Sequence, residues 1–140
     1  MCLRKAVPYK SEKDIIGYKV LAHRSSSGWY SSLTDKYYFY KTDGTENKAR
    51  GELKYDAELK TVGEGALHMF KKKIDAVRYC RTLSKNTNRK NYVIAKCEIP
   101  KDCGYVFRGI QSFCDYFNEY DVTGYCGEKM KILEIEKLEK

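Results

Sequence analysis

The sequence has 140 residues, 42% of them hydrophobic, and carries a formal net charge of +8. This length favours one domain, 1–140, and this hydrophobic share argues against a wholly disordered chain. Because no stretch approaches the roughly 20 apolar residues that span a bilayer and no apolar leader follows the N-terminus, we expect a cytoplasmic protein without a membrane partner.

The six cysteines do not form a metal-binding pattern. No C-x-x-C pair occurs and only two histidines are present, so neither a metal site nor a cofactor is predicted. A cytoplasmic protein keeps its thiols reduced, and a free cysteine packs like a small apolar residue. We expect Cys80 and Cys97 to lie in the core.

The N-terminal part of the chain predicts short strands. Residues 1–13 are polar and are expected to be peripheral. Residues 15–24 are rich in β-branched and aromatic side chains, which predicts a strand, and residues 28–31 begin a second strand after a serine-rich turn. A third apolar run covers residues 37–40, and the Asp-Gly pair that follows it is typical of a hairpin.

The middle of the chain contains the clearest helix. Residues 45–62 are polar and weakly patterned, so we assign them no element. Residues 66–70 predict a short strand, and residues 72–83 a helix, since apolar residues there recur at i, i+3, i+4 and i+7. These apolar positions are Ala76, Tyr79, Cys80 and Leu83.

The C-terminal part predicts further strands. Residues 92–99 alternate apolar and polar side chains, the period of a half-buried strand. Residues 105–108 predict a shorter strand, residues 110–121 fit either a loop or a short helix, and residues 129–135 predict a closing strand or part of a helical tail. The expected fold is α+β: a twisted, mainly antiparallel sheet with one main amphipathic helix on a face.

Several pieces of the sequence carry a resemblance. The chain resembles a group of small uncharacterised phage and prophage proteins in four pieces. These are GYKVL near the start, then GEGALHMF-KKKIDAVRYC, YVIAKCEIP and GYCGEKMKILEI. The end, AKCEIP followed by a cysteine and KILEI, is similar to an uncharacterised module of bacterial pentapeptide-repeat proteins. The resemblance implies a phage-like origin, a compact β-rich fold and binding of host machinery or defence signals, and it supplies no active site.

The positive charge points to an anionic partner. The chain has 27 Lys and Arg against 19 Asp and Glu, and a field of that sign attracts phosphates, although a lysine-rich solvated surface is the plain alternative. Our leading hypothesis is a non-enzymatic protein that binds nucleic acid, a nucleotide signal or a nucleoprotein and regulates or inhibits host machinery. The predicted phosphate contacts are Lys71, Lys72, Arg78, Arg81 and Arg89.

Tyrosine is over-represented, with 13 residues against one tryptophan. Aromatic side chains on a basic sheet can stack on bases, and we predict this role for Trp29 and Tyr30. A second alternative is a protein–protein inhibitor whose tyrosine-rich surface forms the contact, because Tyr, Trp and Arg dominate such surfaces.

Two residues are candidates for catalysis or phosphate contact in their own right. His68 precedes the basic helix, where it would be a general base or a phosphate contact, although a packed histidine is the simpler interpretation. Cys126 lies between glycines that would let its thiol be exposed, although burial is again the simpler interpretation.

The rival enzymatic hypothesis concerns a nucleotide. His23 and Arg24 end a strand, serines follow, and Glu134 and Glu136 lie near the C-terminus, an order that resembles the ADP-ribosyltransferase layout. In that layout the His or Arg holds the dinucleotide, and a Glu stabilises the charge that develops on the ribose. The Ser-Thr-Ser motif is absent, and a solvated charged terminus also explains the two glutamates.

Overall fold

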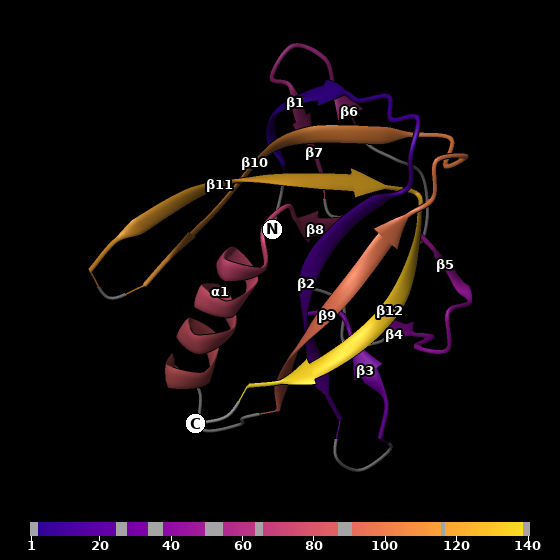
Figure 1. Ribbon diagram of the computed structural model, residues 1–140. Coiled ribbons are helices and arrows are strands. Elements are labelled where there is room, and N and C mark those ends of the chain that lie inside the picture. The colour runs from indigo at the N-terminus through magenta and orange to yellow at the C-terminus, as the bar shows by residue number, and fades with distance from the viewer. Residues whose placement is uncertain are drawn as a thin grey trace.

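The computed structural model describes residues 3–24, 28–33, 38–49, 55–63, 66–86, 91–115 and 117–138 (Figure 1). Within these residues lie many strands and a single helix, α1 (Lys73–Asn86). The strands are β1 (Arg4–Pro8), β2 (Ile15–His23), β3 (Tyr30–Ser31), β4 (Phe39–Tyr40), β5 (Glu46–Lys48), β6 (Tyr55–Asp56), β7 (Thr61–Val62), β8 (Leu67–Phe70), β9 (Tyr92–Ile99), β10 (Val106–Cys114), β11 (Glu119–Gly127) and β12 (Lys129–Lys137). No helix among the described residues is long and apolar enough to cross a membrane.

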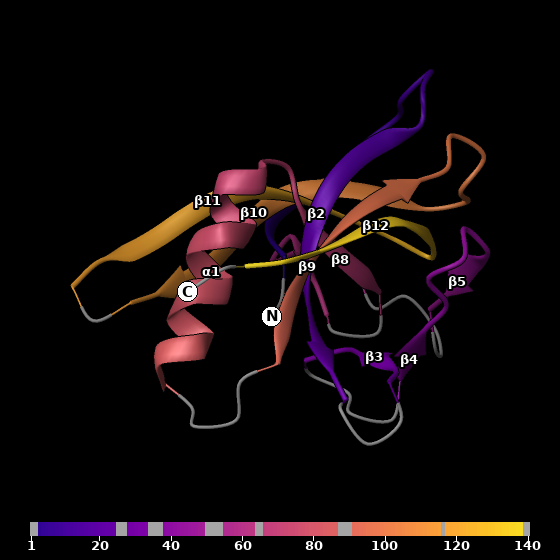
Figure 2. The ribbon, with the colours of Figure 1, turned by 60° about the horizontal axis from the view of Figure 1, so that its bottom comes forward.

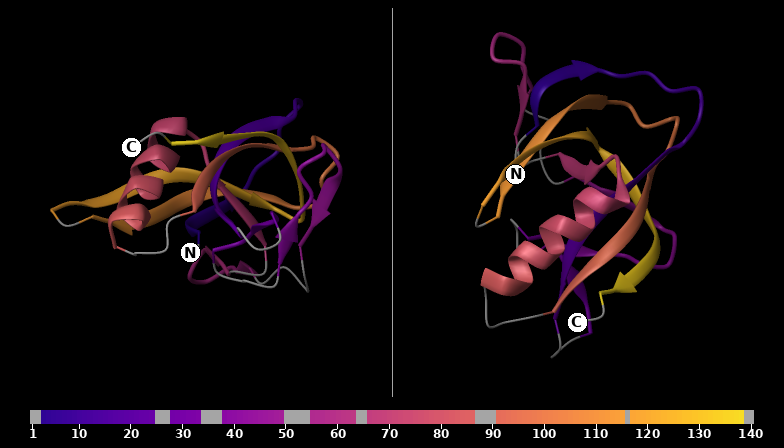
Figure 3. Two further views of the ribbon diagram at one scale, coloured as in Figure 1. Left: turned by 90° about the horizontal axis from the view of Figure 1, so that it is seen from below. Right: turned by 60° about the vertical axis from the view of Figure 1, so that its left-hand side comes forward.

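One large antiparallel sheet dominates the structure. Its strands follow the order β1-β10-β11-β8-β2-β9-β12-β5, with β3 added to β2 and β4 added to β3, while β6 and β7 pair separately. The sheet curls strongly (Figure 2), and α1 lies in the angle between the β10–β11 hairpin and the strands β2 and β9 (Figure 3). The expected fold is therefore confirmed in outline, with far more strand than helix.

The sheet consists of two halves joined at a narrow seam. Strands β2 and β8 share one paired position, Tyr18 opposite Phe70. A Cβ atom on Gly17 would lie 2.6 Å from Met69 Sδ and 2.7 Å from the Phe70 carbonyl oxygen, so only glycine allows this close approach. Beyond the paired position the strands diverge, and Lys19 Nζ donates a hydrogen bond to the His68 carbonyl oxygen at 2.7 Å.

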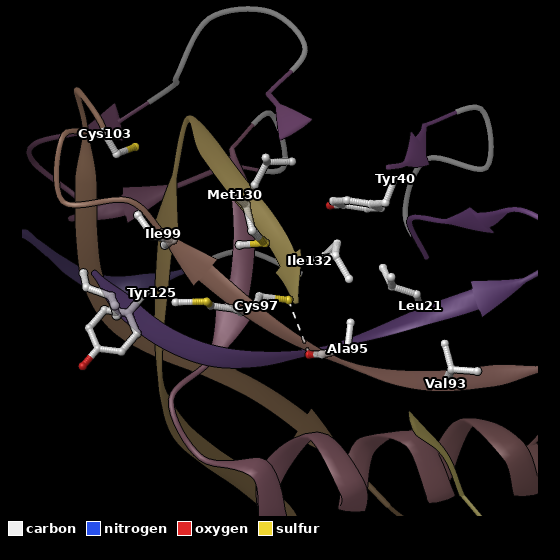
Figure 4. Close-up of a cluster of buried hydrophobic side chains, with 13 residues drawn as sticks. Leu21, Tyr40, Val93, Ala95, Cys97, Ile99, Cys103, Tyr125, Met130 and Ile132 are labelled. Atoms are coloured by element: carbon white, nitrogen blue, oxygen red, sulfur yellow. Dashed lines mark hydrogen bonds between the residues drawn. The ribbon is translucent and has the colours of Figure 1, made fainter. Parts of the chain in front are cut away.

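Three apolar clusters make up the core. The inner cluster lies on the face of the sheet away from α1 (Figure 4), and it includes Leu21, Tyr40, Met69, Cys97 and Ile132. The helix cluster lies between the sheet and α1, and the N-terminal cluster is built around β1. The helix cluster consists of Val20, Phe70, Ala76, Cys80, Ile94 and Phe113, and the N-terminal cluster of Leu3, Ala6, Val62, Ala66, Phe107 and Cys126.

Contrary to the expectation for segment 1–13, its described residues 3–13 are not wholly peripheral. Leu3 and Ala6 are fully buried, and β1 pairs with β10 as an edge strand of the sheet. The prediction failed because Leu3 and Ala6 are the only fully buried residues among 3–13, so the segment as a whole has a low apolar content.

The segment 110–121 is not helical, and most of it is strand rather than loop. Residues 110–114 and 119–121 belong to the long β10–β11 hairpin, which has nine paired positions from Val106 opposite Gly127 to Cys114 opposite Glu119. The predicted strand 105–108 stops before Gly109, but this glycine lies within β10, where a Cβ atom would meet the Arg4 carbonyl oxygen at 2.5 Å. The glycine therefore permits the close crossing of β1.

Two further predictions for the strands need correction. Asp43 and Gly44 form a turn, in which Asp43 Oδ1 accepts a hydrogen bond from the Thr45 N–H at 3.0 Å, but this turn closes no hairpin. Strand β4 pairs with β3, and β5 pairs with β12. The C-terminal segment continues as strand β12 to Lys137 rather than becoming helical.

Replacing Gly17 tests the seam. Gly17→Ala should lower the free energy of unfolding by about 2 kcal/mol or more, because the added methyl group must displace Met69 or separate β2 from β8. Urea denaturation measures this loss. Gly63→Ala is the matched control, since a Cβ atom there meets nothing within 4 Å; equal effects of the two substitutions would contradict the seam.

Candidate functional site

Helix α1 has an apolar inner face and a basic outer face. Ala76 and Cys80 are buried in the helix cluster, and Tyr79 and Leu83 pack beside them. Because an α-helix has 3.6 residues per turn, positions 74, 78, 81 and 85 fall in one line on the opposite side. Arg78, Arg81 and Lys85 occupy this line and are exposed.

The positive charge around α1 is largely unbalanced. The segment 71–86 carries six Lys and Arg, and the carboxylates that contact it within the described residues are Asp75 and Glu136. This leaves a net four positive charges, half of the chain's +8. We refer to the basic face as the exposed set Lys71, Lys72, Arg78, Arg81 and Lys85.

Neither carboxylate lies on the outer line of the helix. Lys73 Nζ and Glu136 Oε2 are 2.7 Å apart. This ion pair raises the pKa of Lys73 and balances its positive charge. Asp75 is buried, and burial raises the pKa of its carboxyl group. Its Oδ1 lies 3.7 Å from Arg78 Nη1, a long contact that leaves the guanidinium available to another anion.

Arg78 is positioned by an aromatic contact. Its guanidinium carbon lies 5.3 Å from the ring centroid of Tyr120, and Tyr120 in turn stacks on Phe113 at 5.0 Å. The β10–β11 hairpin thus supports the side chain from beneath. Among the described residues, no carboxylate lies within ion-pair distance of Lys71, Lys72, Arg81 or Lys85. Arg89, the fifth predicted phosphate contact, lies outside the described residues.

The predicted stacking residues Trp29 and Tyr30 point to opposite sides of the β3–β4 ribbon. Trp29 is 58% exposed and meets Phe39 edge to face, with ring centroids 4.9 Å apart. Tyr30 instead packs against the inner cluster and stacks on His23 at 4.6 Å. The exposed aromatic pair is therefore Trp29 with Phe39, and sequence reasoning missed Phe39.

The residues of the ADP-ribosyltransferase hypothesis are not brought together. Glu136 lies opposite Ile94 on the face that α1 covers, and its carboxylate is paired with Lys73. Glu134 lies two residues away on β12 and is exposed. His23, in contrast, packs on Tyr30 toward the other face, and the Arg24 Nε–H donates to Ser31 Oγ at 3.0 Å.

His68 is an interior residue beside the seam. The residue is 8% exposed, and Nδ1 donates to the Ala66 carbonyl oxygen at 2.9 Å. Among the described residues, its Nε2 atom has no hydrogen-bond partner. Burial, followed by the positive charge of Lys19, lowers the pKa of His68 to about 3, so the neutral buried ring does not contact an external phosphate.

Lys19 is a partly buried cation that the sequence-based site prediction missed. It lies on the same side of β2 as Ile15 and Leu21, and Nζ lies 5.6 Å from the Tyr40 ring centroid. Burial lowers the pKa of Lys19 to about 8. The signal was present in the sequence, because residues 15, 17, 19 and 21 alternate onto one face of the strand.

Four of the five cysteines in the described part of the chain are core residues, and Cys114 is exposed. Cys80 and Cys97 are buried as predicted, and Cys126 is fully buried within β11, where burial raises the pKa of its thiol to about 12. The five cysteines in the described part of the chain are free thiols. Within the same part, no three His, Cys, Asp or Glu side chains gather as a set of metal ligands.

Comparison with family models, with curated proteins and with solved structures finds no match for this chain. The resemblance to small phage proteins therefore remains a prediction, and the interpretation of function depends on the geometry described above.

The buried His68 predicts sensitivity to acid. The unfolded chain takes up a proton at this ring below about pH 6.5 and the folded protein only near pH 3, so stability is lost as the pH falls through this window. Between pH 7.5 and 4.5 the loss should be about 2–3 kcal/mol. His68→Gln, which keeps a donor for Ala66, should remove most of it in urea denaturation.

The other histidine of the chain, His23, provides the matched control. The loss assigned to His68 should persist in His23→Gln, which retains the buried His68 ring. An acid sensitivity that survives in His68→Gln would contradict the assignment.

Proposed function

We propose that this protein binds a phosphate-bearing partner, whether nucleic acid, a nucleotide or a nucleoprotein, through the basic face of α1. Its role is to regulate or inhibit that partner without catalysing a reaction. The resemblance to small phage proteins supports host machinery as the target.

The separation of charge on α1 is the observation that carries this proposal. A helix whose outer face serves only solubility usually interleaves acids and bases, which pair at i, i+4. Along the outer line of α1 the charged residues are Arg78, Arg81 and Lys85, and all three are cations. Like charges at these spacings repel, which costs the isolated helix stability, and this unfavourable arrangement supports the proposal that the face binds an anion.

The chemistry of the side chains fits phosphate. An arginine guanidinium presents a planar set of donors that matches phosphate oxygens, and each neutralised phosphate releases condensed counterions. The aromatic support beneath Arg78 orients its guanidinium before binding, which reduces the entropy lost on association.

Reversing two charges tests the basic face. Arg78→Glu with Arg81→Glu should weaken binding to fluorescent oligonucleotides at least tenfold at low salt, because two phosphate contacts become repulsive. The slope of log affinity against log salt should fall by roughly 1.5–2, depending on whether the probe is single-stranded or duplex. Fluorescence anisotropy between 50 and 200 mM salt, about the range over which such contacts are screened, measures both quantities.

The matched control makes the same change in net charge elsewhere. Lys10 and Lys13 are exposed in the loop between β1 and β2, at the other end of β2 from Trp29. Lys10→Glu with Lys13→Glu should have a much smaller effect. Equal losses of affinity in the two double variants would mean that binding depends on overall charge and not on the basic face. Unchanged affinity in the α1 variant would overturn the proposal.

A further inference from the structure

The β3–β4 ribbon presents an aromatic surface at one end of the molecule. Ser31 lies opposite Phe39, and Trp29 lies on the same side as both. The other side of the ribbon carries Tyr30 and the buried Tyr40, which pack into the inner cluster. One side therefore holds the ribbon on the core, and the other side turns an indole and a phenyl ring toward solvent.

Cations flank this aromatic pair. Arg24 is exposed, and its backbone N–H donates to the Trp29 carbonyl oxygen at 2.7 Å, which places the two residues side by side. Lys41 follows β4 directly and is also exposed. An aromatic ring between cations is the combination that binds a nucleotide, with the base on the ring and the phosphates on the charges.

The basic face of α1 leads toward the same end of the molecule. The His23 N–H donates to the Asn91 carbonyl oxygen at 2.5 Å, so the end of β2 adjoins the start of β9. Five peptide links from Asn86 to Asn91 reach at most about 18 Å, so the C-terminal end of α1 lies within that span of β9. Figures 1 and 2 show the end of α1, the start of β9 and the end of β2 on one side.

These observations distinguish between kinds of phosphate-bearing partner. A base inside a duplex is stacked on its neighbours and offers no face to a protein ring, whereas a single strand can place its bases on aromatic side chains. A free nucleotide would fill the aromatic surface alone and leave the cations of α1 unused. A polynucleotide strand uses both.

We infer that the partner is a single-stranded polynucleotide, with at least one base stacked on Trp29 beside Phe39 and with its backbone running toward the basic face of α1. The inference rests on the proposed function and narrows it to one class of ligand.

The single tryptophan of the chain reports directly on this contact. Emission from Trp29 is followed while the protein is titrated with a dT10 or U10 strand, and separately with a duplex of the same length. Either single strand should quench the emission and bind at least tenfold more tightly than the duplex. Comparison of dT10 with U10 distinguishes DNA from RNA.

Substitution at Trp29 tests the stacking itself. Trp29→Ala should weaken binding of the labelled strand by about tenfold, within the range that one lost base stack produces, while Trp29→Phe should restore most of the affinity. Tyr105→Ala is the matched control, because Tyr105 is 57% exposed against 58% for Trp29 and lies at the far end of the sheet. Thermal melting of each variant verifies that it is folded.

The outcomes separate the two levels of the proposal. Duplex binding as tight as that of the single strands, with unchanged Trp29 emission, would overturn the single-strand inference and leave the basic face as a phosphate-binding surface. Quenching of the wild-type emission, together with equal affinities of Trp29→Ala and Tyr105→Ala for the labelled strand, would also overturn it. Absence of binding to every probe would also overturn the nucleic-acid binding proposed for the basic face.

Discussion

The seam between β2 and β8 is the constraint on which the rest of the structure depends. One paired position, Tyr18 opposite Phe70, joins the two halves of the sheet. The absence of a side chain at Gly17 and the hydrogen bond from Lys19 to His68 let the strands meet and then diverge. Since overpacking a core costs about 1–3 kcal/mol, a single methyl group at Gly17 is enough to disturb this junction.

Helix α1 links this constraint to function. Its inner face packs on Val20 and Ile94 from one half of the sheet and on Phe70 and Phe113 from the other, so it closes the angle that the seam opens. Burial fixes the orientation of the helix, and its basic outer line consequently faces solvent. The same packing places Tyr120 beneath Arg78. Stability and the candidate binding surface therefore use opposite faces of one element.

Local patterns predicted the elements whose partners did not matter. The spacing of Ala76 and Cys80 was enough to predict α1 and the basic side opposite them. The alternation of apolar and polar residues was enough to predict β9. The seam was not predictable, because Gly17 and Met69 meet only in the folded chain. The predicted strand 105–108 stopped before Gly109 for the same reason, because this glycine meets β1 only in the folded chain. Packing against the inner cluster decides which side of the β3–β4 ribbon faces solvent, and this packing exists only in the folded chain. For this reason Tyr30 was predicted to stack beside Trp29, whereas the exposed neighbour of Trp29 is Phe39.

The most direct test of the central claim is nuclear magnetic resonance of the ¹⁵N-labelled protein titrated with a single-stranded decanucleotide. If the outer side of α1 and the β3–β4 ribbon form one binding surface, the largest shift changes will fall on the amides of segment 71–85 and on the Trp29 indole N–H, with the inner cluster unaffected. Changes confined to the inner cluster, or to the β10–β11 hairpin with α1 unaffected, would contradict the claim that this helix presents a binding face.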